Sequence, residues 1–531
     1  MTGRTARLVW HGYRYFPYER VLAEREVQAL TGDRPTAAPD GLDVSLNGHP
    51  TALLARLTYF REVVLSNGET ITPDQAKLEQ SARYEASDAG LAPPKRQSTR
   101  YSAHGLHEYR GKFNPQIVRA IGNLLGLAPG SHVLDPFCGS GTTLLEAAHS
   151  AWNATGFDLN PLAVTVANAK IAAIHTPTKR LTQAADHLVS RLGRRFEGVD
   201  YAEAWSTRVS DHFAGPRWRE TVPDYEYLSR WFREPVLAQL AVILEEIELT
   251  CTNASADVFR VILSDLLREA SLQDPGDLRI RRRKSPQDNY PVVPLFLSSV
   301  SKKLASIAAA RAVLGTLRGR QTARLVDSRE RLPGTGWAAK LPVDAAITSP
   351  PYATALPYID TQRLSLCLLG LVDSTELMPR ERQLIGGREI SQGERSATEA
   401  LLDAPCDDLP PKVIGLARRM VKALATSDGF RRRNTPALLF RYFKDMGRVL
   451  DSVAPHMARG ATFALVVGPN RTTLGGRTFI VDTPNLIADL GRHHGWTVRS
   501  IMKLDAYQRY DVHQRNSIRA ESLVLLDPPD N

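Results

Sequence analysis

Apolar residues recur with two different spacings in the first third of the chain, and the two spacings alternate. Short runs of consecutive apolar residues, typical of buried strands, occur at 131–137 and 153–159. Apolar positions with helical spacing precede, separate and follow these runs, at 115–127, 141–151 and 161–173. This alternation predicts a parallel sheet with helices packed on its faces.

The strand pattern stops after residue 173 and resumes at residue 323. Five further strands are predicted at 323–327, 344–349, 461–468, 496–504 and 521–527, with helices at 442–457 and 485–495. The break at 174–322 contains long helical patterns at 236–250 and 256–272, so we expect a largely helical insertion there. A second insertion, of irregular structure, is expected at about 371–435.

The chain is thus divided into four parts. Residues 96–173 and 323–531 are the two halves of one α/β domain, and 174–322 separates them. Residues 1–95 form an N-terminal region of unclear role, which opens on a cluster of aromatic and basic side chains. These side chains can stack on bases beside phosphates, or can dock the helical segment 18–30 onto the main domain. The docking interpretation is favoured.

Composition narrows the class of protein. The chain has 531 residues, a net charge of +10 and a pI near 9.4, which favours acidic partners such as nucleic acid. Four scattered cysteines support neither a disulfide framework nor a metal site and suit a reducing cytoplasm. No run of about 18 apolar residues predicts a membrane span, and the N-terminus lacks the features of a secretory signal.

A glycine-rich turn follows the first strand of the α/β domain. Its residues are Asp135, Pro136, Phe137, Cys138, Gly139, Ser140, Gly141 and Thr142. Glycines let the backbone bend sharply and let a ligand come close. Ligands of open parallel sheets bind beyond the carboxyl ends of the strands, where the strand order reverses. The turn therefore predicts a ligand site.

The second strand ends in an acidic motif, Asp158-Leu159-Asn160. A carboxylate about twenty positions after a glycine turn can accept hydrogen bonds from ribose hydroxyls. Asp and Asn also begin helices as N-caps, and the two roles are compatible. The spacing favours ribose binding.

A third motif, Ser349-Pro350-Pro351-Tyr352, follows the predicted strand at 344–349. Adjacent prolines have no N–H donors and a fixed φ, so they present carbonyl oxygens as rigid acceptors. An isolated string of this kind can simply end a strand. After the other two motifs, in this order, a catalytic role is favoured.

Together the three motifs resemble the DNA amino-methyltransferases, which methylate cytosine N4 or adenine N6. The resemblance implies S-adenosyl-L-methionine as cofactor, double-stranded DNA as partner, and a Rossmann-like fold with a mostly parallel seven-stranded sheet. Lys112 and Phe113 lie in a segment, 104–116, that resembles the one closing over the methionine end of the cofactor. Asp327 matches the acidic residue near the adenine. A cognate nuclease or phage-defence partner is also implied.

The motif chemistry predicts direct transfer to an amino nitrogen. If Ser349 Oγ and the Pro350 carbonyl accept its two N–H groups, the nitrogen can pyramidalise towards the methyl donor. Pro351 shapes the loop, and Tyr352 stacks on a base that has left the helix. In the family that the chain resembles, serine before the prolines is more frequent among the N4-cytosine enzymes, so the resemblance favours cytosine N4, with adenine N6 as the alternative. An RNA or protein methyltransferase, or an inactive DNA-binding protein with this fold, remains a rival interpretation.

Target recognition is expected in 174–322, helped by 371–435 and 1–95. Two basic runs there are candidates for phosphate contacts, against the alternative of solvated loops. Their residues are Arg279, Arg281, Arg282, Arg283 and Lys284, and Arg431, Arg432 and Arg433.

Overall fold

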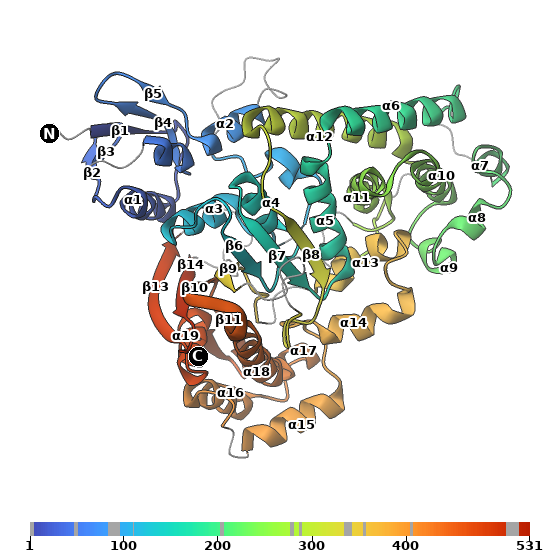
Figure 1. Ribbon diagram of the computed structural model, residues 1–531. Coiled ribbons are helices and arrows are strands. Elements are labelled where there is room, and N and C mark those ends of the chain that lie inside the picture. Colours follow the sequence, from blue (N-terminus) through green and yellow to red (C-terminus); the bar gives the residue numbers. More distant parts are fainter. Residues whose placement is uncertain are drawn as a thin grey trace.

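A seven-stranded sheet lies at the centre of the molecule (Figure 1). The computed structural model describes residues 5–46, 51–82, 96–109, 111–201, 207–274, 276, 281–285, 289–333, 342–353, 357–403, 407–505 and 520–530. The strand order is β13 (Thr497–Asp505), β14 (Ala520–Asp527), β10 (Met457–Val467), β9 (Val343–Thr348), β6 (His132–Asp135), β7 (Asn153–Asp158) and β8 (Gln321–Leu325). Only β14 runs antiparallel to its neighbours. The predicted α/β, Rossmann-like sheet is confirmed.

The strand order reverses between β6 and β9. The chain runs outward from β6 through β7 to β8, and later returns to place β9 on the other side of β6. In the parallel pair, Val133 lies opposite Ala345 and Leu134 opposite Ala346. The loops after these two strands therefore leave the same edge of the sheet side by side, at the position where such sheets bind ligands.

Both faces of the sheet are buried, which explains the continuous apolar runs of its central strands. Val133 packs into the core with α3 (Pro115–Leu124), α4 (Thr142–His149) and α5 (Pro161–His175). The next residue, Leu134, packs into a second core with α18 (Thr435–Val453) and α19 (Thr483–His493). Alternate residues thus fix the sheet between two helical layers.

Between α5 and β8 the described chain is helical. Its elements are α6 (Thr178–Arg195), α7 (Thr207–Ala214), α8 (Trp218–Thr221), α9 (Tyr225–Leu228), α10 (Glu234–Thr250), α11 (Asn253–Ala270) and α12 (Val292–Leu314). Helix α11 packs against α5, and α12 against α2 (Asp74–Ser81) and α11. By length and composition α12 could cross a membrane. However, its Lys303 pairs with Asp265 and its Arg311 donates to the carbonyl of Thr176, as in a helix packed within the protein.

The segment 371–435 is not irregular as expected. It forms α14 (Leu377–Gln383), α15 (Gln392–Asp403), α16 (Pro411–Ala423) and α17 (Phe430–Arg433), after α13 (Tyr358–Leu368). These helices are short and broken by Pro and Gly, so their spacing gives little periodic signal. A hairpin of β11 (Asn470–Leu474) and β12 (Arg477–Val481) was also not predicted.

The N-terminal region is a small sheet and a helix. The strands β1 (Thr5–Trp10), β2 (Thr36–Ala38), β3 (Gly41–Ser45), β4 (Phe60–Leu65) and β5 (Thr70–Ile71) pair in the order β2-β3-β1-β4-β5. Helix α1 (Pro17–Thr31) contacts both α3 and β13. Tyr13, Tyr15 and Tyr18 are buried in the common core. Most of the aromatic cluster therefore packs the region together, in line with the docking interpretation.

Candidate active site

The glycine turn lies between β6 and α4 and adopts backbone angles that suit glycine. Gly139 has φ +47° and Gly141 has φ +78°. A Cβ on Gly141 would lie 2.7 Å from the Cβ of Ala167 in α5, so the helices can meet only at a glycine. The amine of the fully buried Lys170 donates to the Ser140 carbonyl over 2.9 Å. These contacts hold the turn in one shape.

Asp158 ends β7 and faces the turn. Its carboxylate accepts the Gly139 N–H at 2.9 Å and the Asn160 N–H at 2.8 Å. Burial raises the pKa of Asp158 to about 6, although these N–H groups favour the charged form. With the Leu159 N–H as a third donor, the carboxylate keeps a lone pair for a ligand hydroxyl. Asn160 is at the same time the N-cap of α5, so the predicted N-cap role is present, and ribose binding stays a prediction.

The proline motif is tied to the glycine turn by a buried hydrogen bond. Thr348, at the end of β9, donates its hydroxyl to Asp135 at the end of β6 over 2.6 Å. The next residue, Ser349, donates its hydroxyl to the Val466 carbonyl over 3.2 Å. Because its only proton is used in that bond, Ser349 Oγ offers lone pairs, and not a donor, to anything in front of it.

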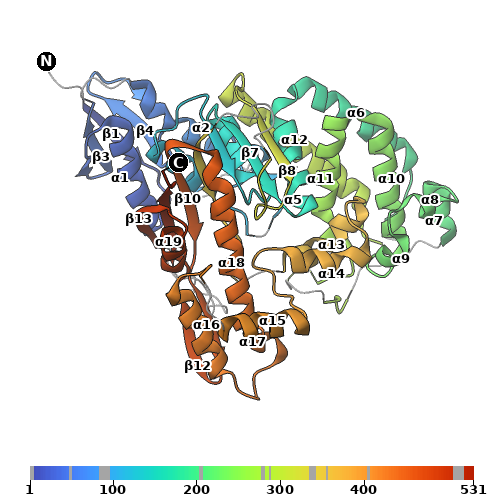
Figure 2. The ribbon, with the colours of Figure 1, turned by 60° about the horizontal axis from the view of Figure 1, so that its bottom comes forward.

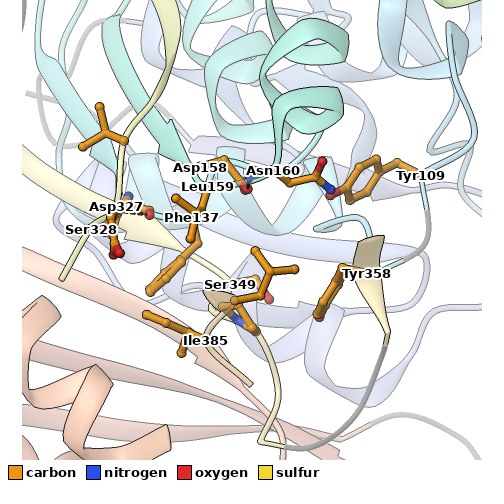
Figure 3. A pocket seen from close by; sticks show the side chains of 16 residues that line it. Tyr109, Phe137, Asp158, Leu159, Asn160, Asp327, Ser328, Ser349, Tyr358 and Ile385 are labelled. Carbon is orange, nitrogen blue, oxygen red and sulfur yellow. Dashed lines mark hydrogen bonds between the residues drawn. The ribbon is translucent and has the colours of Figure 1, made fainter. Parts of the chain in front are cut away.

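The two loops line one pocket (Figure 3). It holds about 680 Å³ of space, part of which is open to solvent. Polar groups come from Gly139, Asp158, Asn160, Asp327, Ser328 and Ser349, and apolar walls from Pro136, Phe137, Leu159, Val326, Pro351, Leu384, Ile385 and the rings of Tyr109 and Tyr358. The glycine turn, through Gly139, and the proline motif, through Ser349 and Pro351, therefore face a common cleft.

Asp327 lies at one end of this pocket, after β8. Arg329 donates to it over 2.6 Å and also pairs with Asp445 of α18 at 3.1 Å. Burial alone would raise the pKa of Asp327, but the hydrogen bonds from Arg329 outweigh it and hold the pKa below its usual value. Asp327 is therefore a fixed carboxylate at neutral pH.

Several predicted site residues lie outside the pocket lining. Asp135, Cys138, Ser140, Thr142 and Pro350 are buried behind it. Lys112 donates to the Thr99 carbonyl over 2.8 Å, and burial lowers the pKa of its amine to about 8. Phe113 packs against the core. The Tyr352 hydroxyl bonds to Glu521 of β14. These residues hold the site in shape in this structure.

The basic run of the helical region is partly engaged in structural contacts. Arg282 donates to the Arg230 carbonyl over 2.6 Å and lies 5.4 Å from the Trp231 ring centre. Arg283 donates to the Gln273 carbonyl over 2.9 Å. Arg281 and Lys284 are exposed, and Arg279 lies outside the described residues.

In the second run, Arg431, Arg432 and Arg433 are all exposed on α17. Arg433 donates to the Asp428 carbonyl over 2.8 Å. Arg432 lies 3.9 Å from the Asp428 carboxylate. Arg433 also donates to the Thr426 carbonyl over 2.6 Å. In both runs, therefore, some guanidinium groups are engaged with neighbouring carbonyl or carboxylate oxygens.

Two aromatic pocket residues, Tyr109 and Tyr358, were missed by sequence reasoning. Tyr109 belongs to the segment 104–116 but lacks any motif of its own, and a Cβ on Gly139 would lie 3.7 Å from its ring. Tyr358 begins α13, whose first N–H groups are capped from a distant helix. Its place depends on that contact, for which the local sequence carries no signal.

A reversed parallel sheet with a glycine turn, an acidic strand end and a proline loop around one pocket defines a Rossmann-like methyltransferase fold. Residues 106–190 match the model of the RMKL-like methyltransferase domain. The chain is 23% identical over 309 residues to the Type II methyltransferase M.MvaI of Kocuria varians, covering 55% of this chain and 63% of that protein. It is 24% identical over 321 residues to M.BsoBI of Geobacillus stearothermophilus, covering 56% of each.

These similarities confirm the resemblance to DNA methyltransferases that the motifs indicate. The chain spans less than two thirds of the length of either relative. The solved structure of TrmN from Thermus thermophilus aligns over 99% of both chains with 12% identity and a TM-score of 0.31. That score is too low to carry the fold assignment, which rests on the strand order and pairing.

Proposed function

We propose that the chain is an S-adenosyl-L-methionine-dependent DNA methyltransferase that modifies the exocyclic amino group of an extruded base, with cytosine N4 preferred. The observation that carries this proposal is the pocket shared by Gly139, Asp158 and Ser349. One wall has groups suited to a nucleoside, and the other has acceptors suited to an amino group.

The residues present fit the cofactor. The Asp158 carboxylate suits ribose hydroxyls, and the apolar side chains of Phe137, Leu159 and Val326 suit the faces of an adenine ring. Ser328 and the charged Asp327 lie at the same end of the pocket and suit the polar edge of that ring. When bound, the cofactor supplies an activated methyl group on a sulfonium.

The chain's own part in the reaction is to position an amino group and to stabilise the charge that develops on it. The amino lone pair is delocalised into the ring of the base, and the nitrogen becomes positive as transfer proceeds. Ser349 Oγ is oriented as an acceptor because its proton is given to Val466. An acceptor fixed in a dry pocket stabilises such charge without reorganising. The rings of Tyr358 and Tyr109 line the remaining walls and exclude water.

The experiment that tests this function is methyl transfer to defined polymers. Duplex DNA, single-stranded DNA and RNA are incubated with the protein and the methyl donor. The polymers are then digested to nucleosides, which are identified by mass spectrometry. N4-methylcytosine in DNA is the expected product, and N6-methyladenine would establish the alternative base. Transfer to RNA alone would reject a DNA substrate. Cofactor binding with no transfer to any polymer would favour an inactive DNA-binding protein.

A further inference from the structure

The hairpin β11–β12 extends from the carboxyl end of β10, beside the proline motif. At its base, Asn470 donates its side-chain amide to the Ala353 carbonyl over 2.5 Å, directly after the Pro351-Tyr352 pair. At its turn, the Gly475 N–H donates to the buried carboxylate of Asp428 over 2.8 Å. The hairpin is therefore anchored at its base to the segment that follows the proline motif, and at its turn to the residue that comes shortly before α17.

One face of the hairpin is buried and the other is exposed to solvent. Leu474 and Val481 are at most 2% exposed and pack into the core with α16 and α18. On the opposite face, Arg471 is paired across the strands with Ile480, and both are exposed. Ile480 is 70% exposed, which is the largest exposed fraction among the large apolar side chains in the described part of the chain. Ile480 and Arg471 are therefore both available on this face for contact with another molecule.

Helix α17 adds to this surface. It packs beside β11, and Figure 2 shows it next to β12 and α16. Phe430 is 63% exposed and is followed by Arg431, Arg432 and Arg433. Neither 430–433 nor 470–481 contains an acidic residue. Arg477 at the turn is also exposed, although its cross-strand partner is the buried Leu474. Burial raises the pKa of Asp360 in α13, two residues after the pocket residue Tyr358, and the charge of Arg431 acts against that shift.

We propose that this hairpin surface contacts the phosphodiester backbone of duplex DNA next to the extruded base. The surface comprises Arg471, Arg477 and Ile480 of the hairpin, with Phe430 and the arginines of α17. The inference rests on the proposed function. Arginines supply the charge that phosphates require, while Ile480 and Phe430 supply apolar contact with sugars or base edges. The hydrogen bond from Asn470 to the Ala353 carbonyl places this DNA contact near the acceptor oxygen of Ser349.

The test compares duplex binding by the full chain and by Arg471→Ala/Arg477→Ala across a series of salt concentrations. Each lost phosphate contact removes about one unit from the slope of log affinity against log salt, so the double variant's slope is expected to be shallower by about two units. Ile480→Ala removes no charge. It is expected to raise the Kd and leave the slope unchanged.

Arg459→Ala serves as the matched control, because Arg459 is an exposed arginine near the start of β10, at the opposite end of that strand from the hairpin. It should leave both slope and Kd unchanged. Methyl transfer to DNA by the wild type, combined with an unaltered slope and Kd in the double variant, would overturn the hairpin assignment alone. An unaltered Kd for Ile480→Ala would show that Ile480 makes no apolar contact with the DNA. If the wild type transfers no methyl group to DNA, the proposed function and the hairpin assignment both fail.

Discussion

Ser349 is the side chain proposed to accept a hydrogen bond from the amino group that is methylated. Its hydroxyl proton is committed to Val466, and the preceding Thr348 is tied to Asp135. The oxygen is therefore both oriented and held at the reversal point of the sheet. A hydroxyl held in this way acts as an acceptor without any prior rotation or desolvation.

Replacement of this acceptor should reduce the rate of transfer more than binding. In Ser349→Ala, kcat should fall on the order of 100-fold, because one fixed dipole facing the developing charge is lost. The Kd for the cofactor should stay within a factor of two or so, since Ser349 lies opposite the ribose-binding wall. Single-turnover assays and equilibrium titration measure the two quantities. Ser349→Thr, which keeps the hydroxyl, is the control, and a raised KM with normal kcat would contradict the role.

Asp158 should make cofactor affinity depend on pH. Burial raises the pKa of its carboxyl to about 6, so the carboxyl gains a proton as the pH falls through 6 and loses an acceptor for ribose. We expect the cofactor Kd of the wild type to rise between pH 7 and pH 5. Asp158→Asn should bind weakly at both values, with a flatter profile.

Asp135 needs a parallel control because burial also raises its pKa to about 6. Asp135→Asn should keep the pH dependence of cofactor binding, since this carboxyl bonds Thr348 and does not line the pocket. A wild-type profile that Asp158→Asn reproduces, or that Asp135→Asn abolishes, would refute the assignment to Asp158.

Helix α13 shows how an element that lines the site depends on a distant helix. Glu381 of α14 accepts the Ile359 N–H at 2.7 Å and the Asp360 N–H at 3.3 Å. These are among the first N–H groups of α13, which have no partner within the helix. Because Tyr358 is the first residue of the same helix, this cap also sets the position of its ring in the pocket.

Glu381 should give the protein a pH-dependent stability. Burial raises the pKa of its carboxyl from 4.5 to about 7, so the folded state holds the proton more tightly than the unfolded state. The resulting stabilisation is fully present below pH 4.5 and is lost as the pH rises to 7, by about 3 kcal/mol. Chemical denaturation at several pH values should show that Glu381→Gln lacks this component. Parallel pH profiles for wild type and variant would be inconsistent with it.

The elements predicted correctly are those that the sheet buries on both faces. The runs around Val133, Phe157 and Ile347 are apolar because helices cover both sides of them, and burial of that kind is visible in sequence. The hairpin was missed because only Leu474 and Val481 are fully covered, and what covers them is α16, far away in sequence. The motif residues of the site were predicted from local strings. Tyr358 was not, because the cap from Glu381 determines its place.

For the molecule as a whole, the net charge is +10, but the basic side chains predicted to contact DNA are not equally available. Arg283 is committed to carbonyl oxygens of its own region, and Arg282 to a carbonyl and to the Trp231 ring. Arg281 and Lys284 are exposed, as is α17. The proposed phosphate contacts therefore fall to a subset of the basic residues that the sequence singles out.

This division predicts different effects for neighbouring residues of the same basic run. Arg281→Ala/Lys284→Ala should flatten the salt dependence of DNA binding by up to about two units. Arg283→Ala should lower Tm, because it releases the Gln273 carbonyl that closes the loop. Thermal denaturation and salt titrations distinguish the two cases. An identical salt slope for wild type and the double variant would assign the run to structure alone.

The pairing of β6 with β9 also constrains how the chain is made. His132–Asp135 is an inner strand of the sheet, yet one of its two edges is completed only by Val343–Thr348. At synthesis rates of about 5–20 residues per second, a nascent chain spends on the order of ten to forty seconds with that apolar edge open. During this interval the half-built sheet is exposed to aggregation, and the helices of α6–α12 emerge before the strand that will close it. Production of the protein should therefore be sensitive to translation speed and to chaperone supply.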